Sequence, residues 1–182
     1  EDFMQALTEV SPVPITYEDI EGEAKGYFHT TDHRIAIQEG MSQSQTVKTA
    51  IHEVAHAKLH DREQNQDIDA VLDKDRNTKE VEAESVAYTV CQHFGIDTSD
   101  YSFGYIAGWS SDRDMKELKS SLDIIRKTAS ELITGIEDRL AELQKDRAVE
   151  QEQNKESILL IQNDDLTQYS LVSVVGMDRQ EL

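Results

Sequence analysis

The stretch TAIHEVAHAKLHD, residues 49–61, carries three histidines at intervals of four residues and a glutamate directly after the first. Positions four apart lie on one face of an α-helix, so His52 and His56 can bind one metal ion together. Glu53 lies about 100° around the helix from His52, close enough to reach a water molecule on that ion. This is the H-E-x-x-H pattern, in which two histidines bind zinc (Zn²⁺) and the glutamate is a general base.

The residues around this motif have the pattern of an amphipathic helix from about Gln45 to His60. Its apolar positions recur on one stripe, at Val47, Ile51, Val54, Ala55 and Leu59. Ser42 and Gln45 form a capping box at its start. H-E-x-x-H is short and also occurs by chance in helices that bind no metal, but a well-formed helix with the motif beside its buried stripe favours a metal site. His60 lies too far along the axis to share the ion, and we expect it to interact with the helix C-terminus.

A catalytic zinc ion usually has three protein ligands and one water molecule. The segment after His56 has no glycine turn that would return a nearby histidine, so the third ligand is expected on the next helix, within KEVEAES. Glu80 and Glu84 share one face of that helix, whereas Glu82 points about 160–200° away from both. We assign Glu80 as the third ligand and Glu84 as the group that holds a ligand histidine through its other ring nitrogen, with the reverse assignment as the main alternative. For Glu82 we expect only the stabilisation that an acidic residue gives a helix N-terminus.

The sequence pattern predicts a mixture of helices and strands. A short helix is expected around residues 3–10, followed by extended chain forced by Pro12 and Pro14. EAKGYFHTTDHRIAIQEG predicts a hairpin with strands at about 24–29 and 34–38. Thr78 as N-cap and Gly95 at the end bound a second helix, and an amphipathic helix is expected from about 114 to 152.

The chain divides into three expected parts. Residues 1–145 form the main domain, residues 146–156 are a linker or helix end, and residues 157–182 form a β-hairpin with strands at about 157–162 and 168–175. The hairpin is expected to cap the domain or to begin another one. Because the chain starts at Glu1 without methionine, we expect it to be a piece of a larger parent chain with other domains.

Composition excludes several classes of partner. With 37 acidic and 18 basic residues, the net charge is −19, which disfavours direct nucleic-acid binding. A third role, as a nuclease or a DNA-mimicking inhibitor of restriction enzymes, would rest on the acidity alone, and mimicry would need the acids in a phosphate-like row, whereas they are scattered. No apolar run approaches the roughly 20 residues that span a bilayer, so no membrane partner is expected. The single cysteine, Cys91, cannot form an internal disulfide and fits the cytoplasm.

Together these motifs resemble a known group of proteins. HEVAH with an upstream hairpin and a downstream E-x-x-A-E helix is similar to the ImmA/IrrE group of zincin-like metallopeptidases. It resembles still more the C-terminal metallopeptidase domain of ArdC/LtrC-type antirestriction proteins of plasmids and conjugative elements, in which a Y-I-x-x-W segment follows, here YIAGW at residues 105–109. The resemblance covers about residues 1–140. Members of that family commonly carry a single-stranded DNA-binding domain ahead of the peptidase, and we expect any such region to lie outside this piece of the parent chain.

The resemblance implies an α+β, zincin-like fold: a small antiparallel sheet packed on the H-E-x-x-H helix, a second metal-ligand helix and a long C-terminal helix. It also implies zinc bound by His52, His56 and Glu80, with Glu53 as the catalytic acid and base.

We therefore expect a zinc-dependent metallopeptidase acting on a protein or peptide. Tyr105 or Tyr101 is the expected donor to the oxyanion. The strand RIAIQ, residues 34–38, is expected to be an edge that pairs with the substrate. The alternative is a catalytically silent metal-binding module through which a larger mobile-element protein interacts with partners.

Overall fold

The structure of the chain is a computed structural model that describes residues 2–61, 74–99, 109–110, 113 and 115–177, with side chains up to residue 153. In chain order its elements are α1 (Asp2–Val10), β1 (Ile15–Glu18), β2 (Gly26–His29), β3 (Arg34–Gln38), α2 (Gln43–His60), α4 (Arg76–His93) and α6 (Met115–Met177). The chain separates into two compact units, Glu1–Leu140 and Ala141–Leu182. The fold is α+β, as expected, and the first unit contains the three strands of the described residues and the H-E-x-x-H helix.

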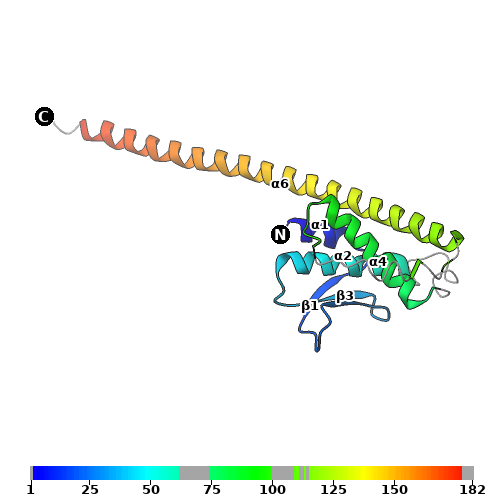
Figure 1. The fold of residues 1–182 in the computed structure, drawn as a ribbon. Coiled ribbons are helices and arrows are strands. Elements are labelled where there is room, and N and C mark those ends of the chain that lie inside the picture. The colour runs from blue at the N-terminus through cyan, green and yellow to red at the C-terminus, as the bar shows by residue number, and fades with distance from the viewer. Residues whose placement is uncertain (1, 62–73, 100–108, 111–112, 114, 178–182) are drawn as a thin grey trace. The chain divides into compact units, whose positions relative to one another are not determined.

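Helix α2 is the central element of the first unit. It begins at its expected cap, where the Ser42 side chain accepts a hydrogen bond of 3.3 Å from the backbone N–H of Gln45. Its apolar stripe is fully buried at Ile51, Val54 and Ala55. One side of α2 packs against β2 and β3 and another against α4, so the metal motif lies at the junction of sheet and helix layers (Figure 1).

The sheet has three strands in the order β1-β3-β2. Strands β2 and β3 form the expected antiparallel hairpin, but β1 pairs with β3 in parallel, so the sheet is mixed and not purely antiparallel. The two prolines before β1 did indicate extended chain. The parallel pairing is non-local and has no turn motif that could reveal it in the sequence.

Strand β3 is the central strand, which overturns the expectation that RIAIQ is an edge available to substrate. Both of its sides are paired, to β1 through residues such as Ile15 with Ile35 and to β2 through Tyr27 with Ala36. Ile35, Ala36 and Ile37 are all fully buried, which is the pattern of a central strand. Within the described residues, β2 is instead the strand with an unpaired edge next to α2.

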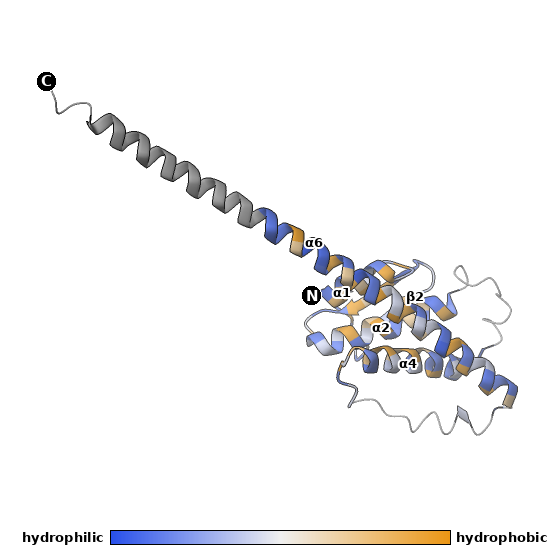
Figure 2. Ribbon diagram, turned by 90° about the horizontal axis from the view of Figure 1, so that it is seen from above, coloured by the Kyte–Doolittle hydropathy of each residue, from blue (hydrophilic) through white to orange (hydrophobic). Residues whose placement is uncertain are grey.

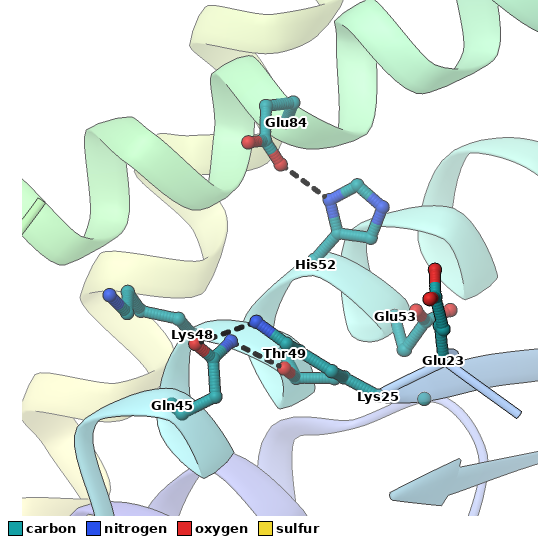
Figure 3. A pocket seen from close by; sticks show the side chains of 9 residues that line it. Glu23, Lys25, Gln45, Lys48, Thr49, His52, Glu53 and Glu84 are labelled. Atoms are coloured by element: carbon teal, nitrogen blue, oxygen red, sulfur yellow. Dashed lines mark hydrogen bonds and ion pairs between the residues drawn. The ribbon is translucent and has the colours of Figure 1, made fainter. Parts of the chain in front are cut away.

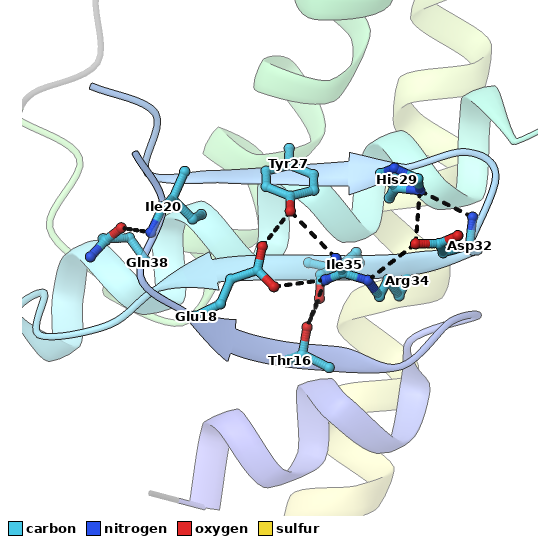
Figure 4. Close-up of polar contacts among 9 residues, drawn as sticks. All are labelled: Thr16, Glu18, Ile20, Tyr27, His29, Asp32, Arg34, Ile35 and Gln38. Carbon is cyan, nitrogen blue, oxygen red and sulfur yellow. Dashed lines mark hydrogen bonds and ion pairs between the residues drawn. The ribbon is translucent and has the colours of Figure 1, made fainter. Parts of the chain in front are cut away.

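The two faces of the sheet differ in chemistry. On the face away from α2, the Arg34 guanidinium donates to Thr16 at 3.2 Å and to Glu18 at 3.1 Å, and the Tyr27 hydroxyl donates to Glu18 (Figure 4). On the other face a Cβ atom at Gly26 would lie 2.6 Å from the Thr49 side chain of α2. The glycine therefore permits the close approach that brings β2 alongside the metal motif.

Helix α4 starts earlier than expected. Its N-cap is Asp75, whose carboxylate accepts a hydrogen bond of 2.7 Å from the backbone N–H of Thr78, so the expected cap at Thr78 is wrong. The Thr78 hydroxyl instead accepts a hydrogen bond of 3.0 Å from the indole N–H of Trp109, which is 6% exposed. The helix ends as expected, with Gly95 at a φ of 66°.

Helix α6 spans Met115–Met177, so the hairpin expected over residues 157–182 is wrong for the part that the structure describes. The expected strands contain β-branched residues, but no glycine or proline interrupts residues 157–175. Extending an existing helix costs less than nucleating a new element, and no described strand pairs with this segment. Up to Gln153, α6 carries alternating hydrophilic and apolar patches along its length, as amphipathic helices do (Figure 2).

Within the first unit, α6 contacts α1 and α4. Gly135 lies against Val10, where an added Cβ would come within 3.1 Å of a methyl group. Glu137 accepts a hydrogen bond of 2.8 Å from His93. In the part of the chain that the structure describes, no helix has the length and apolarity needed to cross a membrane.

Candidate metal site

Side chains from α2 and α4 converge on one point. The Nε2 atoms of His52 and His56 lie 3.0 Å apart, and Glu80 Oε2 lies 3.6 Å from the first and 3.4 Å from the second. A tetrahedral zinc ion with bonds of about 2.0–2.1 Å separates its ligand atoms by about 3.3 Å. The spacing and the two-imidazole, one-carboxylate chemistry therefore fit a zinc ion with an open fourth position.

The second expected acid, Glu84, lies on the outer side of His52. Its Oε2 is 2.9 Å from His52 Nδ1, the nitrogen that faces away from the convergence point (Figure 3). The distance suits an ion pair between the Glu84 carboxylate and the His52 imidazole. Burial alone would lower the pKa of His52, yet Glu80 and Glu84 together with the charge of Glu53 outweigh it and raise that pKa to about 10. The imidazoles of His52 and His56, each within 3.6 Å of the carboxylate, hold the pKa of Glu80 far below its usual range.

Glu53 lies beside the convergence point and is 8% exposed. It accepts a hydrogen bond from the backbone N–H of Phe28 in β2, which fixes the carboxylate against the strand. Burial raises the pKa of Glu53, against the opposing charges of His52 and His56. A carboxylate with a raised pKa, held next to a metal site, is suited to accept and return a proton.

Two hollows flank the site and share Gly26, His52 and Glu53. The first, of about 450 Å³, is also lined by Lys25, Lys48 and Glu84, among others (Figure 3). The second, of about 630 Å³, extends along β2 on the other side and is lined by charged residues of α4. The convergence point is therefore open to solvent from two directions along one strand.

Two residues that were not expected at the site, His60 and Glu82, lie directly behind it. His60, 8% exposed, has its Nδ1 3.0 Å from His56 Nδ1. Its Nε2 lies 3.1 Å from a carboxylate oxygen of Glu82, which is fully buried. The expectation that Glu82 is only a helix-terminal acid is therefore wrong. The sequence did contain a signal for the burial of Glu82. Glu82 precedes the buried Val86 by one helical turn and therefore lies on the buried face of α4.

The structure brings the expected metal ligands and their neighbours together, and it does not describe the expected oxyanion donors. Tyr105 and Tyr101, the expected oxyanion donors, lie outside the described residues. His52, His56 and Glu80 are brought together, Glu53 lies next to them, and Glu84 contacts His52.

This fold and this site define the class of the protein: an α+β, metallopeptidase-like domain with a candidate His-His-Glu metal centre. The family model of the IrrE N-terminal-like domain, Peptidase_M78, matches residues 8–99, and the chain belongs to this family. The match supports the ImmA/IrrE part of the resemblance found in the sequence.

A relative extends the comparison. The chain is 40% identical over 118 residues to the uncharacterized protein pXO2-81 of Bacillus anthracis, an alignment that covers 64% of this chain. The chain spans only 19% of that protein's length. No solved structure matches the chain.

Zinc uptake is expected to release about one proton per chain at pH 7. The His52 pKa of about 10 in the metal-free chain means that this imidazole is protonated at pH 7, whereas a metal ligand must be neutral. Zinc affinity should therefore rise with pH, by about tenfold per unit for one proton, until the pH exceeds that pKa. Titration calorimetry in two buffers of different ionisation enthalpy measures the proton directly. A binding enthalpy that does not depend on the buffer would contradict the prediction.

Proposed function

We propose that this domain is a zinc-dependent peptidase that hydrolyses a peptide bond in a protein substrate. The observation that carries the proposal is the convergence of His52, His56 and Glu80 beside the buried carboxylate of Glu53. A helix rich in histidine for structural reasons would not need an acid from a second helix at ligand distance. Nor would it need a further acid held against the sheet.

The chemistry follows from the positions of these side chains. Zinc held by His52, His56 and Glu80 would polarise the substrate carbonyl and lower the pKa of a water molecule toward about 7. Glu53 takes the proton of the attacking water and passes it to the leaving amine, so that the two halves of the substrate separate. Glu84 orients His52 through its outer nitrogen. Tyr105 remains our proposed donor to the oxyanion, as the sequence suggested.

We propose that the substrate lies along the outer edge of β2. The two hollows meet at Gly26 and Glu53, and the second continues along β2 past Tyr27 and Phe28. An extended peptide can pair with an unpaired strand edge through its backbone. Gly26 lines both hollows, so it marks the point on the strand where they meet.

The charges of the second hollow indicate which side chains such a peptide carries. Besides the site residues Glu53 and Glu80, its charged lining residues are Arg76 and Lys79, from the first turn of α4. Both belong to a chain whose net charge is −19, so this positive pair is a local exception. We therefore expect a preference for an acidic residue on one side of the cleaved bond.

The proposed setting is a mobile genetic element. The ArdC/LtrC-like segment YIAGW and a relative whose name carries the plasmid designation pXO2 support this part of the proposal. We further propose that the domain works in the cytoplasm as part of a larger protein.

The proposal is tested by digestion of a proteome-derived peptide library, with cleavage sites determined by mass spectrometry. We expect the zinc-loaded chain to cleave and to enrich acidic residues on one side of the bond, and the chelated chain to be inactive. The double variant Arg76→Glu, Lys79→Glu should lose the acidic preference. Cleavage that persists in His56→Ala would indicate a contaminating protease, and a zinc-loaded chain that cleaves nothing would favour the silent metal-binding module.

A further inference from the structure

Glu82 has an environment unlike that of the two other acids near the start of α4. Its side chain is fully buried, whereas Glu80 is 46% and Glu84 28% exposed. A buried carboxylate costs several kcal/mol unless charges and hydrogen bonds compensate it. Three groups do so here: Lys74 Nζ at 2.8 Å, the Ser121 hydroxyl of α6 at 2.8 Å and His60 Nε2 at 3.1 Å.

The partners of Glu82 determine where the protons of His60 lie. Lys74 has only donor hydrogens and the Ser121 hydroxyl donates, so the carboxylate of Glu82 acts as an acceptor toward both. The same oxygen that accepts from Lys74 also faces His60 Nε2, and that nitrogen must therefore carry a hydrogen. A neutral imidazole has one donor and one acceptor nitrogen, which leaves His60 Nδ1 as an acceptor.

The tautomer of His60 in turn determines which nitrogen of His56 carries a hydrogen. His60 Nδ1 lies 3.0 Å from His56 Nδ1, and two acceptors at this distance would repel each other, so His56 Nδ1 carries the hydrogen. The lone pair of His56 is then on Nε2, the atom that faces His52 and Glu80. His52 reaches a carboxylate directly, through Glu84, whereas His56 reaches one only through a second imidazole.

We propose that Glu82 and His60 form a buried relay that fixes the tautomer and the ring orientation of His56, which makes both of them positioning residues of the metal site. The proposal rests on the proposed zinc site. It assigns a role to the third histidine of the helix and to the buried acid. Because Ser121 belongs to α6, it also connects the start of the long helix to a metal ligand.

Two replacements of His60 separate this role from a purely structural one. In His60→Asn a carboxamide oxygen takes nearly the place of Nδ1 and can accept from His56, whereas in His60→Leu nothing can. We expect His60→Leu to lower zinc affinity by about 10–100-fold, as the loss of a hydrogen-bond partner of a metal ligand does. We expect His60→Asn to keep most of the wild-type affinity. Val86→Ala, a cavity variant one turn along the same face of α4, should lose stability but keep the zinc affinity of the folded chain.

Affinities are measured by competition with a chromophoric chelator, and Co²⁺ absorption spectra report the geometry of the bound ion. Histidine two-bond ¹⁵N–¹H spectra should show the hydrogen of His60 on Nε2 in the metal-free chain and that of His56 on Nδ1 in the zinc-loaded chain. A hydrogen on Nδ1 of His60, or equal zinc affinity in wild type and His60→Leu, would overturn the relay. A wild-type chain that takes up no zinc would contradict the proposed function instead, while the tautomer of His60 would still decide the relay.

Discussion

Glu80→Ala is expected to lower zinc affinity by about a hundredfold or more, and Glu84→Ala by only about tenfold. Structural zinc sites with four ligands contribute about 10–16 kcal/mol, so one ligand is worth about 3 kcal/mol, or two orders of magnitude. Glu80 Oε2 lies within 3.6 Å of both Nε2 atoms, whereas Glu84 contacts only the outer nitrogen of His52. Loss of an outer partner costs about 10–100-fold, and because the Glu84 side chain is 28% exposed, water can take its place, which puts the loss at the low end.

Metal content by inductively coupled plasma mass spectrometry and chelator competition measure this difference. His56→Ala is the positive control and should resemble Glu80→Ala, because both remove a ligand atom from the same point. Glu39→Ala, an exposed acid after β3, is the charge-matched control and should bind zinc as wild type does. If Glu84→Ala proves the more damaging of the two, the roles of Glu80 and Glu84 are reversed.

Most of the first unit could be predicted because its signals are local. The cap at Ser42, the buried stripe of α2, the β2–β3 hairpin and Gly95 each lie within a few residues of the structure that they determine. Apart from the cap of α4, which lies at Asp75 and not at Thr78, the errors concerned non-local contacts. Nothing in the sequence near β1 shows that it pairs in parallel with β3, and that single pairing turned the expected substrate edge into the central strand.

In the candidate site, too, local features could be predicted from the sequence and non-local contacts could not. Helical spacing was enough to place His52, His56 and Glu53 together and to select the face that holds Glu80 and Glu84. The buried relay behind them was not predictable in this way, because it depends on which side of α4 packs inward and on Ser121, 39 positions from Glu82 along the chain. A buried polar group is recognised only once its partners are known, and here they come from three separate segments.

Glu53→Gln is expected to lower the rate of peptide hydrolysis by about 10²–10⁴-fold while leaving zinc bound. Glutamine has nearly the same shape and can still accept from the backbone N–H of Phe28, but it cannot take a proton from water. The rate is measured as kcat/KM on a peptide found in the library digestion, and zinc content is measured on the same sample. Glu39→Gln, which removes an exposed carboxylate after β3, is the matched control and should keep wild-type activity.

The same substitution should make the metal-free chain more stable above pH 5. Because burial raises the pKa of Glu53 in the folded state, its charged form opposes folding at every pH above the ordinary value of 4.5. A neutral glutamine removes the free-energy cost of the buried charge, so the Tm of the variant should exceed that of the wild type. The difference in Tm should shrink as the pH falls below 4.5, because the glutamate is then protonated in both the folded and the unfolded state. A loss of activity with zinc retained and a higher Tm is what a buried catalytic base produces. Glu53→Gln that loses zinc, or that unfolds at a lower temperature than wild type, would mean that the glutamate supports the structure instead.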